Sequence, residues 1–423
     1  MCDEIAVQPS GPVDARVQPP GSKSITNRAL VCAAMAEGRS VLGGALESED
    51  TQVMVESLHR LGIAVDVRGD TFHVAGGGAQ LATDHADLFV GNSGTTMRFL
   101  TAVLAAYRGR FRLDGVPRMR ERPIGDLLAA LRQLGGRAES EGGNDCPPII
   151  VQAAGLEGGT ARVRGDISSQ FLSGLLLACP YARRDVTLIV DGELVSQPYV
   201  RMTIGVMAAF GVCVESQSLS QFVIRAGQRY RGRDFAVEPD ASAASYFWGA
   251  AAITGGRATV AGLTTSSLQG DVMFVECLRR MGCEVQHSET DTTVIGRDLQ
   301  GIDVDMNAIS DTVQTLAAVA LFARGPTTIR GVAHIRHKET DRIGDLAREL
   351  RKFGATVEEF PDGLRIHPGP LQGAVVETYN DHRMAMSLAL PGLRVPGVII
   401  RNPACTAKTY PRFFEELQRL RHC

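Results

Sequence analysis

The amino-acid sequence predicts a mixed α/β (α+β) chain of two similar domains, each made of three βαβαββ units whose helices are buried inside surrounding sheets. Three observations lead to this prediction: a helix-ending glycine that returns at regular intervals, a series of apolar helices between these glycines, and short β-branched runs after each glycine. Repetition at a fixed period is typical of a chain built from copies of one structural unit.

The first series consists of helix ends of the form Leu-x-x-Φ-Gly, where Φ is apolar. They occur at 58–62, 131–135, 278–282 and 350–354, with a variant at 207–211, so successive glycines are 73, 76, 71 and 72 residues apart. Glycine is favoured just after a helix because it adopts left-handed backbone angles without strain. Two strand-like runs joined by a turn follow, as in GIAVDVRGDTFHVAG.

The second series consists of helices rich in alanine and leucine, each with a polar residue at its start. The starts are Ser24, Ser93, Ser168, Asp240, Ser310 and Asp381. Serine and aspartate are favoured N-cap residues. Because these helices have little polar face, we expect them to be buried. Each unit therefore follows the order strand, helix, strand, helix, hairpin.

The sixth copy stops at its second helix, FFEELQRLRHC, with no hairpin behind it. We expect the N-terminal segment EIAVQPSGPVDARVQP to supply that hairpin, because Ser-Gly-Pro at 10–12 favours a turn between two strand-like runs. This assigns residues 1–18 and 238–423 to one discontinuous domain and residues 19–237 to a central domain. Hinge crossings are expected near 19–20 and 238–239.

Composition excludes several classes of protein. The 423 residues are 44% apolar and 22% charged, with no apolar run of 18 residues and no signal-like N-terminus, so we expect a cytoplasmic protein. A net charge of −3 gives no reason to expect nucleic acid or a membrane as a partner. The nine cysteines lack C-x-x-C spacing, which favours reduced, structural thiols over disulfides or a zinc site.

Seven cations stand at predicted helix starts, where the partial positive charge of the helix disfavours them. They are Lys23, Arg28, Arg122, Lys338, Arg342, Arg383 and Lys408, and they include three of the chain's four lysines. One such cation alone is usually a solvated surface charge, and Arg342 could simply pair with Glu339 one turn away. Their repetition at equivalent positions predicts a shared cleft that binds more than one anionic group.

Two acids belong to the same set of helix starts. Asp311 could be only an N-cap neighbour and Glu339 only a first-turn acid, but within a cationic cleft both are candidates for moving protons. His382 has no histidine or cysteine at ligand spacing, so no metal site is expected. The GSKS stretch lacks the spacing of a nucleotide-binding P-loop.

The motifs that carry these residues are similar to those of one known family. They are PGSKSITNR, GNSGTTMR, RERPIGDL, SSQFLSGLL, SQPY, EPDASAASYF, KETDR, YNDHRMAM and CTAKTYP. The chain resembles the 5-enolpyruvylshikimate-3-phosphate synthase family over nearly its whole length. The resemblance implies an inside-out α/β barrel architecture, enolpyruvyltransferase-like, and transfer of the enolpyruvyl group of phosphoenolpyruvate to shikimate 3-phosphate in chorismate and aromatic amino-acid biosynthesis. It also implies a monomer without metal or cofactor, and a target of the inhibitor glyphosate.

The resemblance also assigns site residues. It implies that shikimate 3-phosphate is bound by Lys23, Ser24, Arg28, Ser168, Ser169, Gln170, Ser196, Tyr199, Asp311, His334 and Lys338. It implies that phosphoenolpyruvate is bound by Lys23, Gly94, Arg122, Gln170, Arg342, Arg383 and Lys408. The implied catalytic residues are Asp311, as base towards the 5-hydroxyl, and Glu339, as acid towards C3 with Lys23 nearby; Lys23 and Glu339 could exchange roles.

This sequence departs from the family pattern at two positions. His334 stands where members commonly have asparagine, which puts its contact with shikimate 3-phosphate in question. Phe99 stands where many members have proline, and this change is expected to shift the helix that carries Gly94 and to alter the tolerance of glyphosate.

Two alternative functions remain open at the level of sequence. The sister transferase that acts on UDP-N-acetylglucosamine in cell-wall synthesis shares the fold, but typically has a reactive cysteine in a loop that here is LDGVPRMRERPIG, without cysteine. A non-catalytic repeat protein that binds phosphorylated metabolites is the other alternative. Asp311 and Glu339 favour an enzyme, because a simple anion binder has no use for acids.

Overall fold

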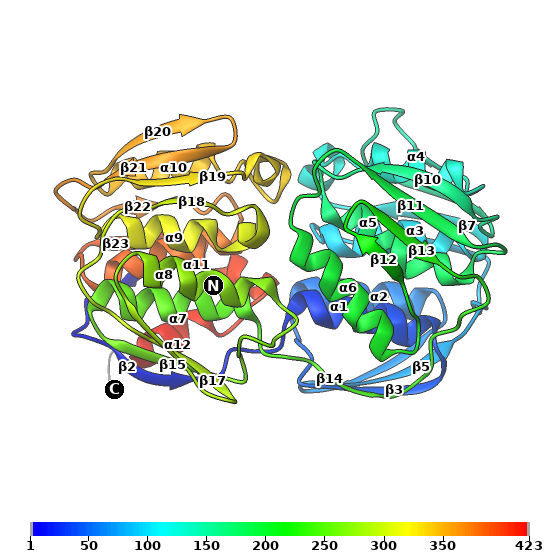
Figure 1. Cartoon of the computed structure of the whole chain (residues 1–423), viewed down its shortest axis with the longest axis horizontal. Coiled ribbons are helices and arrows are strands. Elements are labelled where there is room, and N and C mark those ends of the chain that lie inside the picture. Colours follow the sequence, from blue (N-terminus) through cyan, green and yellow to red (C-terminus); the bar gives the residue numbers. More distant parts are fainter. Residues whose placement is uncertain (1–2, 421–423) are drawn as a thin grey trace. The chain divides into compact units, whose positions relative to one another are not determined.

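A computed structural model describes residues 3–420 and separates the chain into two compact units. Unit 1 holds the residues up to Pro20 and those from Glu238 onward, and unit 2 is Gly21–Val237. Within each unit, the apolar helices lie inside and the strands lie outside (Figure 1). The fold class predicted from the repeats is therefore confirmed, with separate sheets around the helices of each unit.

Unit 2, which the structure describes completely, contains three four-stranded sheets of one pattern: a parallel pair, then two antiparallel pairs. The first is β14 (Asp234–Ala236), β3 (Glu37–Gly43), β5 (Thr71–Gly77) and β4 (Ala64–Arg68). The second is β6 (His85–Phe89), β7 (Arg108–Asp114), β9 (Ile149–Ala154) and β8 (Ala138–Ser140). The third is β10 (Gly159–Arg164), β11 (Val186–Asp191), β13 (Gln221–Ile224) and β12 (Glu215–Ser218).

The described part of unit 1 repeats this pattern in two sheets and shortens it in a third. One sheet is β2 (Asp14–Val17), β15 (Arg257–Ala261), β17 (Asp291–Ile295) and β16 (Glu284–His287). The next is β18 (Asp303–Asp305), β19 (Thr327–Arg330), β21 (Gly363–His367) and β20 (Thr356–Phe360). The three-stranded sheet is β22 (Val375–Val376), β23 (Val398–Arg401) and β1 (Glu4–Val7).

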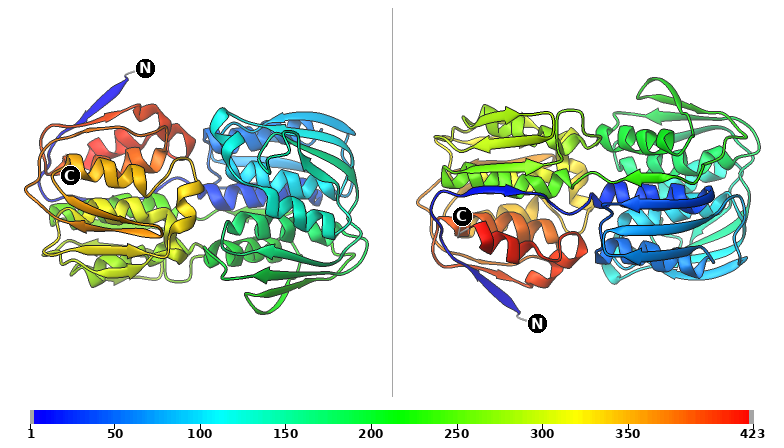
Figure 2. Two further views of the ribbon diagram at one scale, coloured as in Figure 1. Left: turned by 90° about the horizontal axis from the view of Figure 1, so that it is seen from above. Right: turned by 90° about the horizontal axis from the view of Figure 1, so that it is seen from below.

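The prediction that the N-terminal segment forms a hairpin is wrong. Strand β1 pairs antiparallel with β23, with Glu4 opposite Arg401, whereas β2 pairs parallel with β15, with Asp14 opposite Arg257. The two strands diverge and join different sheets of unit 1 (Figure 2). The edges of the two sheets explain this pairing. Without β1 and β2, the strands β23 and β15 would each have unpaired backbone N–H and C=O groups at a sheet edge, and a hairpin of β1 with β2 would leave those groups unsatisfied.

Two strands are separated along the chain from the rest of their repeated copy by a crossing between the two units. Strand β2 is the first strand of the fourth copy, but residues 21–237 follow it before that copy continues at Glu238. Strand β14 is likewise the first strand of the first copy, although it comes last in unit 2. Unit 2 is thus inserted between the first strand and the first helix of a unit 1 copy.

Each copy contributes one buried helix and one outer helix. The buried helices are α1 (Lys23–Met35), α3 (Gly94–Ala105), α5 (Ser169–Ala178), α7 (Ala241–Thr254), α9 (Val313–Ala320) and α11 (His382–Ala389). The outer helices are α2 (Glu49–Arg60), α4 (Gly125–Gln133), α6 (Gln197–Ala209), α8 (Phe274–Arg280), α10 (Gly344–Lys352) and α12 (Phe413–Arg419). Short 3-10 helices are η1 (Pro117–Glu121), η2 (Cys179–Tyr181), η3 (Gly270–Met273), η4 (Asn307–Thr312), η5 (Ala333–His337), η6 (Leu390–Leu393) and η7 (Pro403–Lys408).

Each unit has its own hydrophobic core around the buried helices. In α7, all residues are buried, including the single tryptophan, Trp248. Among residues 3–420, every helix is too short or too polar to span a bilayer. The seven cysteines in the described range are free thiols, and the other two, Cys2 and Cys423, lie outside it.

The five glycines predicted to end helices do so with left-handed backbone angles, between φ +82° at Gly62 and +111° at Gly282. At the end of α2, Gly62 N–H donates to the carbonyl of His59 and Ile63 N–H donates to the carbonyl of Leu58, both at 2.9 Å. These two bonds satisfy carbonyl groups that the last turn of a helix leaves without partners. The glycine prediction is confirmed.

The N-cap prediction is confirmed at four of six helices. Side chains of Ser93, Ser168, Asp240 and Asp381 accept hydrogen bonds from the first turns of α3, α5, α7 and α11. It is wrong for α1, where Ser22 caps the helix and Ser24 lies inside it. It is also wrong for α9, because Ser310 lies in the preceding 3-10 helix η4.

Candidate functional site

In unit 1, six of the predicted site residues form one connected group of charges. Asp311 comes from η4, Arg383 from the first turn of α11, and Lys408 from the end of η7. Lys338, Glu339 and Arg342 come from the segment between η5 and α10. The group therefore joins the last two of the repeated copies at the starts of their helices.

Arg342 is the centre of this group. Its side chain is 1% exposed and contacts three carboxylates: Nε lies 2.7 Å from Asp381 Oδ2 and Nη2 lies 2.9 Å from Glu339 Oε2. Its Nη1 lies 3.3 Å from Asp311 Oδ1. Burial alone would lower the pKa of Arg342, but Asp381 and Glu339 raise it above the ordinary value. A buried charge of this kind is tolerated because acids surround it.

The other three cations of unit 1 contact the two predicted catalytic acids. Arg383 Nη2 donates to Asp311 Oδ2 at 2.8 Å, and Lys338 Nζ lies 3.8 Å from Asp311 Oδ1. Lys408 Nζ donates to Glu339 Oε1 at 2.7 Å. Each acid is therefore held by more than one cation. The alternative that Arg342 only forms a surface pair with Glu339 does not describe this buried group.

Two histidines lie beside the charged group and stay neutral. His334 is 5% exposed, its Nε2 lies 3.0 Å from Ser310 Oγ, and burial and the charge of Lys338 lower its pKa to about 3. His382 is 1% exposed, and burial holds its pKa well below the ordinary value. Within the described residues, no group of three or more histidine, cysteine or acidic side chains has the arrangement of a metal site.

Sequence reasoning missed two members of this group. Asp381 was predicted only as a helix cap, yet its fully buried carboxylate also accepts from Arg342 Nε and Nη2, at 2.7 and 3.1 Å. Ser242, in the first turn of α7, donates to Asp271 and lies 3.4 Å from Arg383 Nη2. The signal for Asp381 is its place directly before His382 and Arg383, whereas no local pattern marks Ser242.

In unit 2, the predicted site residues also stand at helix starts. Lys23 and Ser24 lie in the first turn of α1, Gly94 begins α3, Ser169 and Gln170 begin α5 after the cap Ser168, and Ser196 precedes α6, whose first turn holds Tyr199. Arg122 follows η1 directly. The first turn of a helix has backbone N–H groups without partners inside the helix, and such groups suit the binding of anions.

Arg28 joins α1 to α6. Its Nε donates to Thr203 Oγ1 at 2.7 Å and its Nη2 donates to the carbonyl of Tyr199 at 3.2 Å. Its guanidinium carbon lies 5.1 Å from the ring centroid of Phe99. Phe99, which departs from the family pattern, therefore packs directly against a residue that is predicted to bind shikimate 3-phosphate. Burial lowers the pKa of Arg28 to about 10, which leaves it charged at neutral pH.

Gly94 leaves room for the side chain of Arg122. A Cβ atom at Gly94 would lie 2.4 Å from Arg122 Nη2, closer than any real contact. The guanidinium of Arg122, which is 3% exposed, also donates from Nη1 to the carbonyl and side-chain oxygens of Asn92, both at 3.2 Å. The missing side chain at Gly94 therefore leaves room for a cation as well as for the approach of an anion.

A buried acid of unit 2 was also missed. Asp50, on α2, is 3% exposed and its Oδ1 accepts from Asn27 Nδ2 at 3.0 Å and from Ser93 Oγ at 2.8 Å. Ser93 is the cap of α3, so Asp50 ties the start of α3 to α1 and α2. Gln170 Nε2 lies 3.5 Å from Thr95 Oγ1, which connects the starts of α5 and α3.

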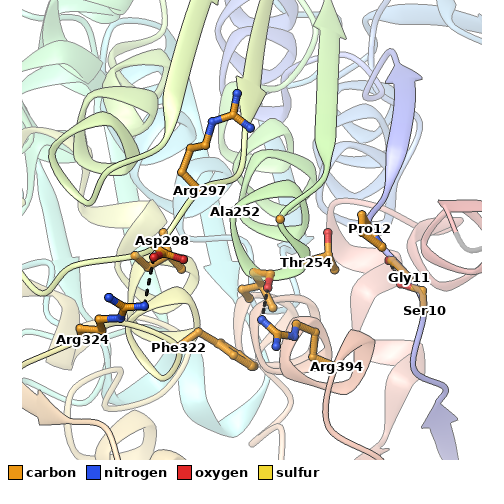
Figure 3. Close-up of a pocket in the computed structure, with 13 residues that line it drawn as sticks. Ser10, Gly11, Pro12, Ala252, Thr254, Arg297, Asp298, Phe322, Arg324 and Arg394 are labelled. Carbon is orange, nitrogen blue, oxygen red and sulfur yellow. Dashed lines mark hydrogen bonds and ion pairs between the residues drawn. The ribbon is translucent and has the colours of Figure 1, made fainter.

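A cavity of about 900 Å³ in unit 1 lies away from these groups. Its lining includes Thr254, Arg297, Phe322, Arg324 and Arg394 (Figure 3). Thr254 is the last residue of α7, whereas Ser242 is in its first turn, about 18 Å away at 1.5 Å per residue. Arg394 donates to the carbonyl of Ile253 at the end of α7, and Arg324 forms an exposed ion pair with Asp298, so both interactions of these cations are with partners inside the protein.

Comparisons with known proteins identify the family. The family model described as EPSP synthase (3-phosphoshikimate 1-carboxyvinyltransferase) matches residues 7–417. A relative named 3-phosphoshikimate 1-carboxyvinyltransferase from Nostoc punctiforme is 51% identical, covering 96% of this chain and 97% of the relative. A chloroplastic protein of that name from Arabidopsis thaliana is 46% identical, covering 99% of this chain and 84% of the relative.

A solved structure of EPSP synthase from Acinetobacter baumannii has the same fold, with a TM-score of 0.83 and 26% identity over 99% of this chain and 98% of that one. Sequence and structure thus agree over nearly the whole length, and the chain belongs to the EPSP synthase (3-phosphoshikimate 1-carboxyvinyltransferase) family.

Proposed function

We propose that this protein is a 3-phosphoshikimate 1-carboxyvinyltransferase: it transfers the enolpyruvyl group of phosphoenolpyruvate to the 5-hydroxyl of shikimate 3-phosphate and releases phosphate. The observation that carries this proposal is the full-length match to one enzyme family. The charged group of unit 1 supports it, because two acids held among four cations suit proton transfer next to bound anions. A non-catalytic anion binder needs no such acids.

The sister transferase of cell-wall synthesis has less support. The loop in which that enzyme would have a reactive cysteine forms η1 here, and residues 113–125 contain none. The full-length relatives carry the name of the shikimate enzyme. We also propose that the protein acts as a monomer in the cytoplasm.

The proposed mechanism is an addition followed by an elimination. Asp311 takes the proton of the 5-hydroxyl as that oxygen attacks C2 of phosphoenolpyruvate, and Glu339, with Lys23 nearby, gives a proton to C3. In the second step the bond between C2 and the phosphate oxygen breaks, a proton leaves C3, and the double bond forms again. Cations stabilise the charge that gathers on the departing phosphate. The binding roles predicted for residues of both units are part of this proposal.

The ion pairs of unit 1 suggest how binding prepares the acids. In the structure, Arg383 and Arg342 contact Asp311, and Lys408 contacts Glu339. A phosphate or carboxylate group that binds these cations competes with the two acids for them. Substrate binding would therefore draw these cations away from the carboxylates of Asp311 and Glu339 and leave both acids available for proton transfer.

The proposed reaction is tested by phosphate release from phosphoenolpyruvate. We expect release only when shikimate 3-phosphate is also present, because its 5-hydroxyl is the nucleophile. Measuring inorganic phosphate with UDP-N-acetylglucosamine in place of shikimate 3-phosphate provides the control. Equal release with either acceptor, or with neither, would contradict the proposal.

Asp311→Asn tests the proposed base. The amide has nearly the same size but cannot accept the hydroxyl proton, so we expect kcat to fall by a factor of about 10² to 10⁴. Binding of shikimate 3-phosphate should persist, as measured by the increase in Tm that it causes. A variant with near-normal kcat would remove Asp311 from this role.

Gly94→Ala tests the contact between α3 and Arg122. The added methyl group would displace a flexible guanidinium rather than backbone, so we expect a nearly unchanged Tm and a KM for phosphoenolpyruvate raised about tenfold. The KM for shikimate 3-phosphate should change little. If both KM values stay at wild-type levels, Arg122 does not depend on this glycine.

His334→Asn tests the neutral state of His334. In the folded state His334 has a pKa of about 3, whereas in the unfolded chain its pKa is near 6.5. Between these pH values only the unfolded chain takes up a proton at His334, so acid favours unfolding. Between pH 7 and 5, the wild type should lose about 2 kcal/mol more stability than the variant. Chemical denaturation at both pH values measures this difference, and equal losses would contradict it.

A further inference from the structure

Three strained backbone positions lie together in unit 1. In the part of the chain that the structure describes, the non-glycine residues with positive φ are Asp145, Ser196, Tyr379, Asn380 and Asn402. Such residues are uncommon, and they concentrate where surrounding structure holds the backbone for a functional reason. The last three directly precede the segments that carry Asp381, Arg383 and Lys408.

The first of two left-handed turns runs from Thr378 to Asp381. Asp381 N–H donates to the carbonyl of Thr378 at 2.8 Å, and the two central residues, Tyr379 and Asn380, have φ of +53° and +55°. Positive φ at both central positions is the pattern of a type I′ turn, which favours glycine and asparagine and disfavours tyrosine. The turn ends at the cap of α11, so it decides where Asp381 and Arg383 lie.

A buried glutamate explains the tyrosine. Tyr379 Oη donates to Glu349 Oε1 at 2.7 Å, and the fully buried Glu349 also accepts from Lys352 Nζ at 2.7 Å. Glu349 belongs to α10, which begins two residues after Arg342. One helix therefore fixes both Arg342 and the turn that carries its partner Asp381.

The second turn is at Asn402, with φ of +46°, immediately before η7 and hence before Lys408. Asn402 Nδ2 donates to Asn380 Oδ1 at 3.1 Å. This bond links the segment that carries Lys408 to the segment that carries Arg383. Both asparagines are exposed, so their substitution has little effect on the core.

We propose that Tyr379, Asn380 and Asn402 are positioning residues that set the spacing of Arg383, Lys408 and the Arg342–Asp381 pair for phosphoenolpyruvate. The proposal rests on the proposed function, which assigns these cations to that substrate. The three residues act through Asp381, Arg383 and Lys408, by fixing the backbone from which these side chains project. If they only stabilised the fold, their loss would lower Tm without favouring one substrate over the other.

The main experiment compares two substitutions at one position. Asn380→Ala removes the side-chain bond and disfavours positive φ, and we expect it to raise the KM for phosphoenolpyruvate about five- to tenfold. Asn380→Gly removes the same bond but accepts positive φ, so its KM should lie closer to that of the wild type. The KM for shikimate 3-phosphate should stay within about twofold in both variants.

Two further variants test the linked contacts. Tyr379→Phe removes the hydroxyl that donates to Glu349 and accepts from Arg348 Nη1 at 3.1 Å, and Asn402→Ala strains the second turn. Each should raise the KM for phosphoenolpyruvate several-fold. Gly69→Ala is the matched control. It places alanine at φ +60° in the turn between β4 and β5, with no atom within 4 Å of the new Cβ. Its KM values should equal those of the wild type.

A second readout separates this proposal from the proposed function. Binding of phosphoenolpyruvate alone and with shikimate 3-phosphate is followed by the fluorescence of Trp248, the single tryptophan. The Asn380→Ala dissociation constant should rise in parallel with its KM. If the wild type binds phosphoenolpyruvate but shows no turnover, the proposed function is wrong, and the dissociation constants of the variants still decide the positioning role. If the wild type does not bind phosphoenolpyruvate, both the proposed function and the positioning role are wrong.

Three results would overturn the positioning role. The first is a KM and dissociation constant for phosphoenolpyruvate unchanged in Asn380→Ala, Asn402→Ala and Tyr379→Phe. The second is an equal change in the KM values of both substrates. The third is a loss of Tm in these variants with no change in either KM, as a purely structural role would give.

Discussion

The candidate site of unit 1 depends on one constraint, the burial of the Arg342 guanidinium. A guanidinium that is 1% exposed is stable only if acids surround it, and Asp381, Glu339 and Asp311 provide them. These acids come from three different segments. The end of η4, the start of α11 and the segment before α10 must therefore meet at one point. Arg383 and Lys408 then offset the remaining negative charge. Removing one acid would leave a buried cation partly unpaired, which costs more than the pair itself contributes.

The same contacts change the expectation for the seven cations. From the sequence, the seven cations were expected to be available for anionic groups in one shared cleft. In the structure, the four cations of the charged group in unit 1 are already paired with three carboxylates, so this group has a small net charge rather than four free positive charges. Under the proposed function, an anionic substrate would have to match the planar fork of an arginine better than the carboxylate already paired with it.

Local signals in the sequence predicted much of this arrangement. The glycines after the helices, the caps Ser93, Ser168, Asp240 and Asp381, and the burial of the alanine-rich helices follow from short-range chemistry, and the structure agrees. The partners of β1 and β2 were not predictable in this way, because sheet pairing joins residues hundreds of positions apart. Ser242 and Asp50 were missed for a related reason. Their contacts with Arg383 and Ser93 exist only after distant segments pack together.

The insertion of unit 2 into a copy of unit 1 explains why one chain crossing lies next to the predicted site residue Lys23 and the other lies next to Ser242, which contacts Arg383. The segment after β2 leads directly to Ser22 and Lys23 at the start of α1, and the segment after β14 leads directly to Asp240 and Ser242 at the start of α7. In an uninterrupted copy, the first strand would connect to the first helix of the same unit. Here β2 of unit 1 connects to α1 of unit 2, and β14 of unit 2 connects to α7 of unit 1. The first residues of α1 and α7 therefore directly follow the two connections between the units. A change of backbone angles at either crossing would therefore act first on these two helix starts, where the first turn orients the unpaired backbone N–H groups.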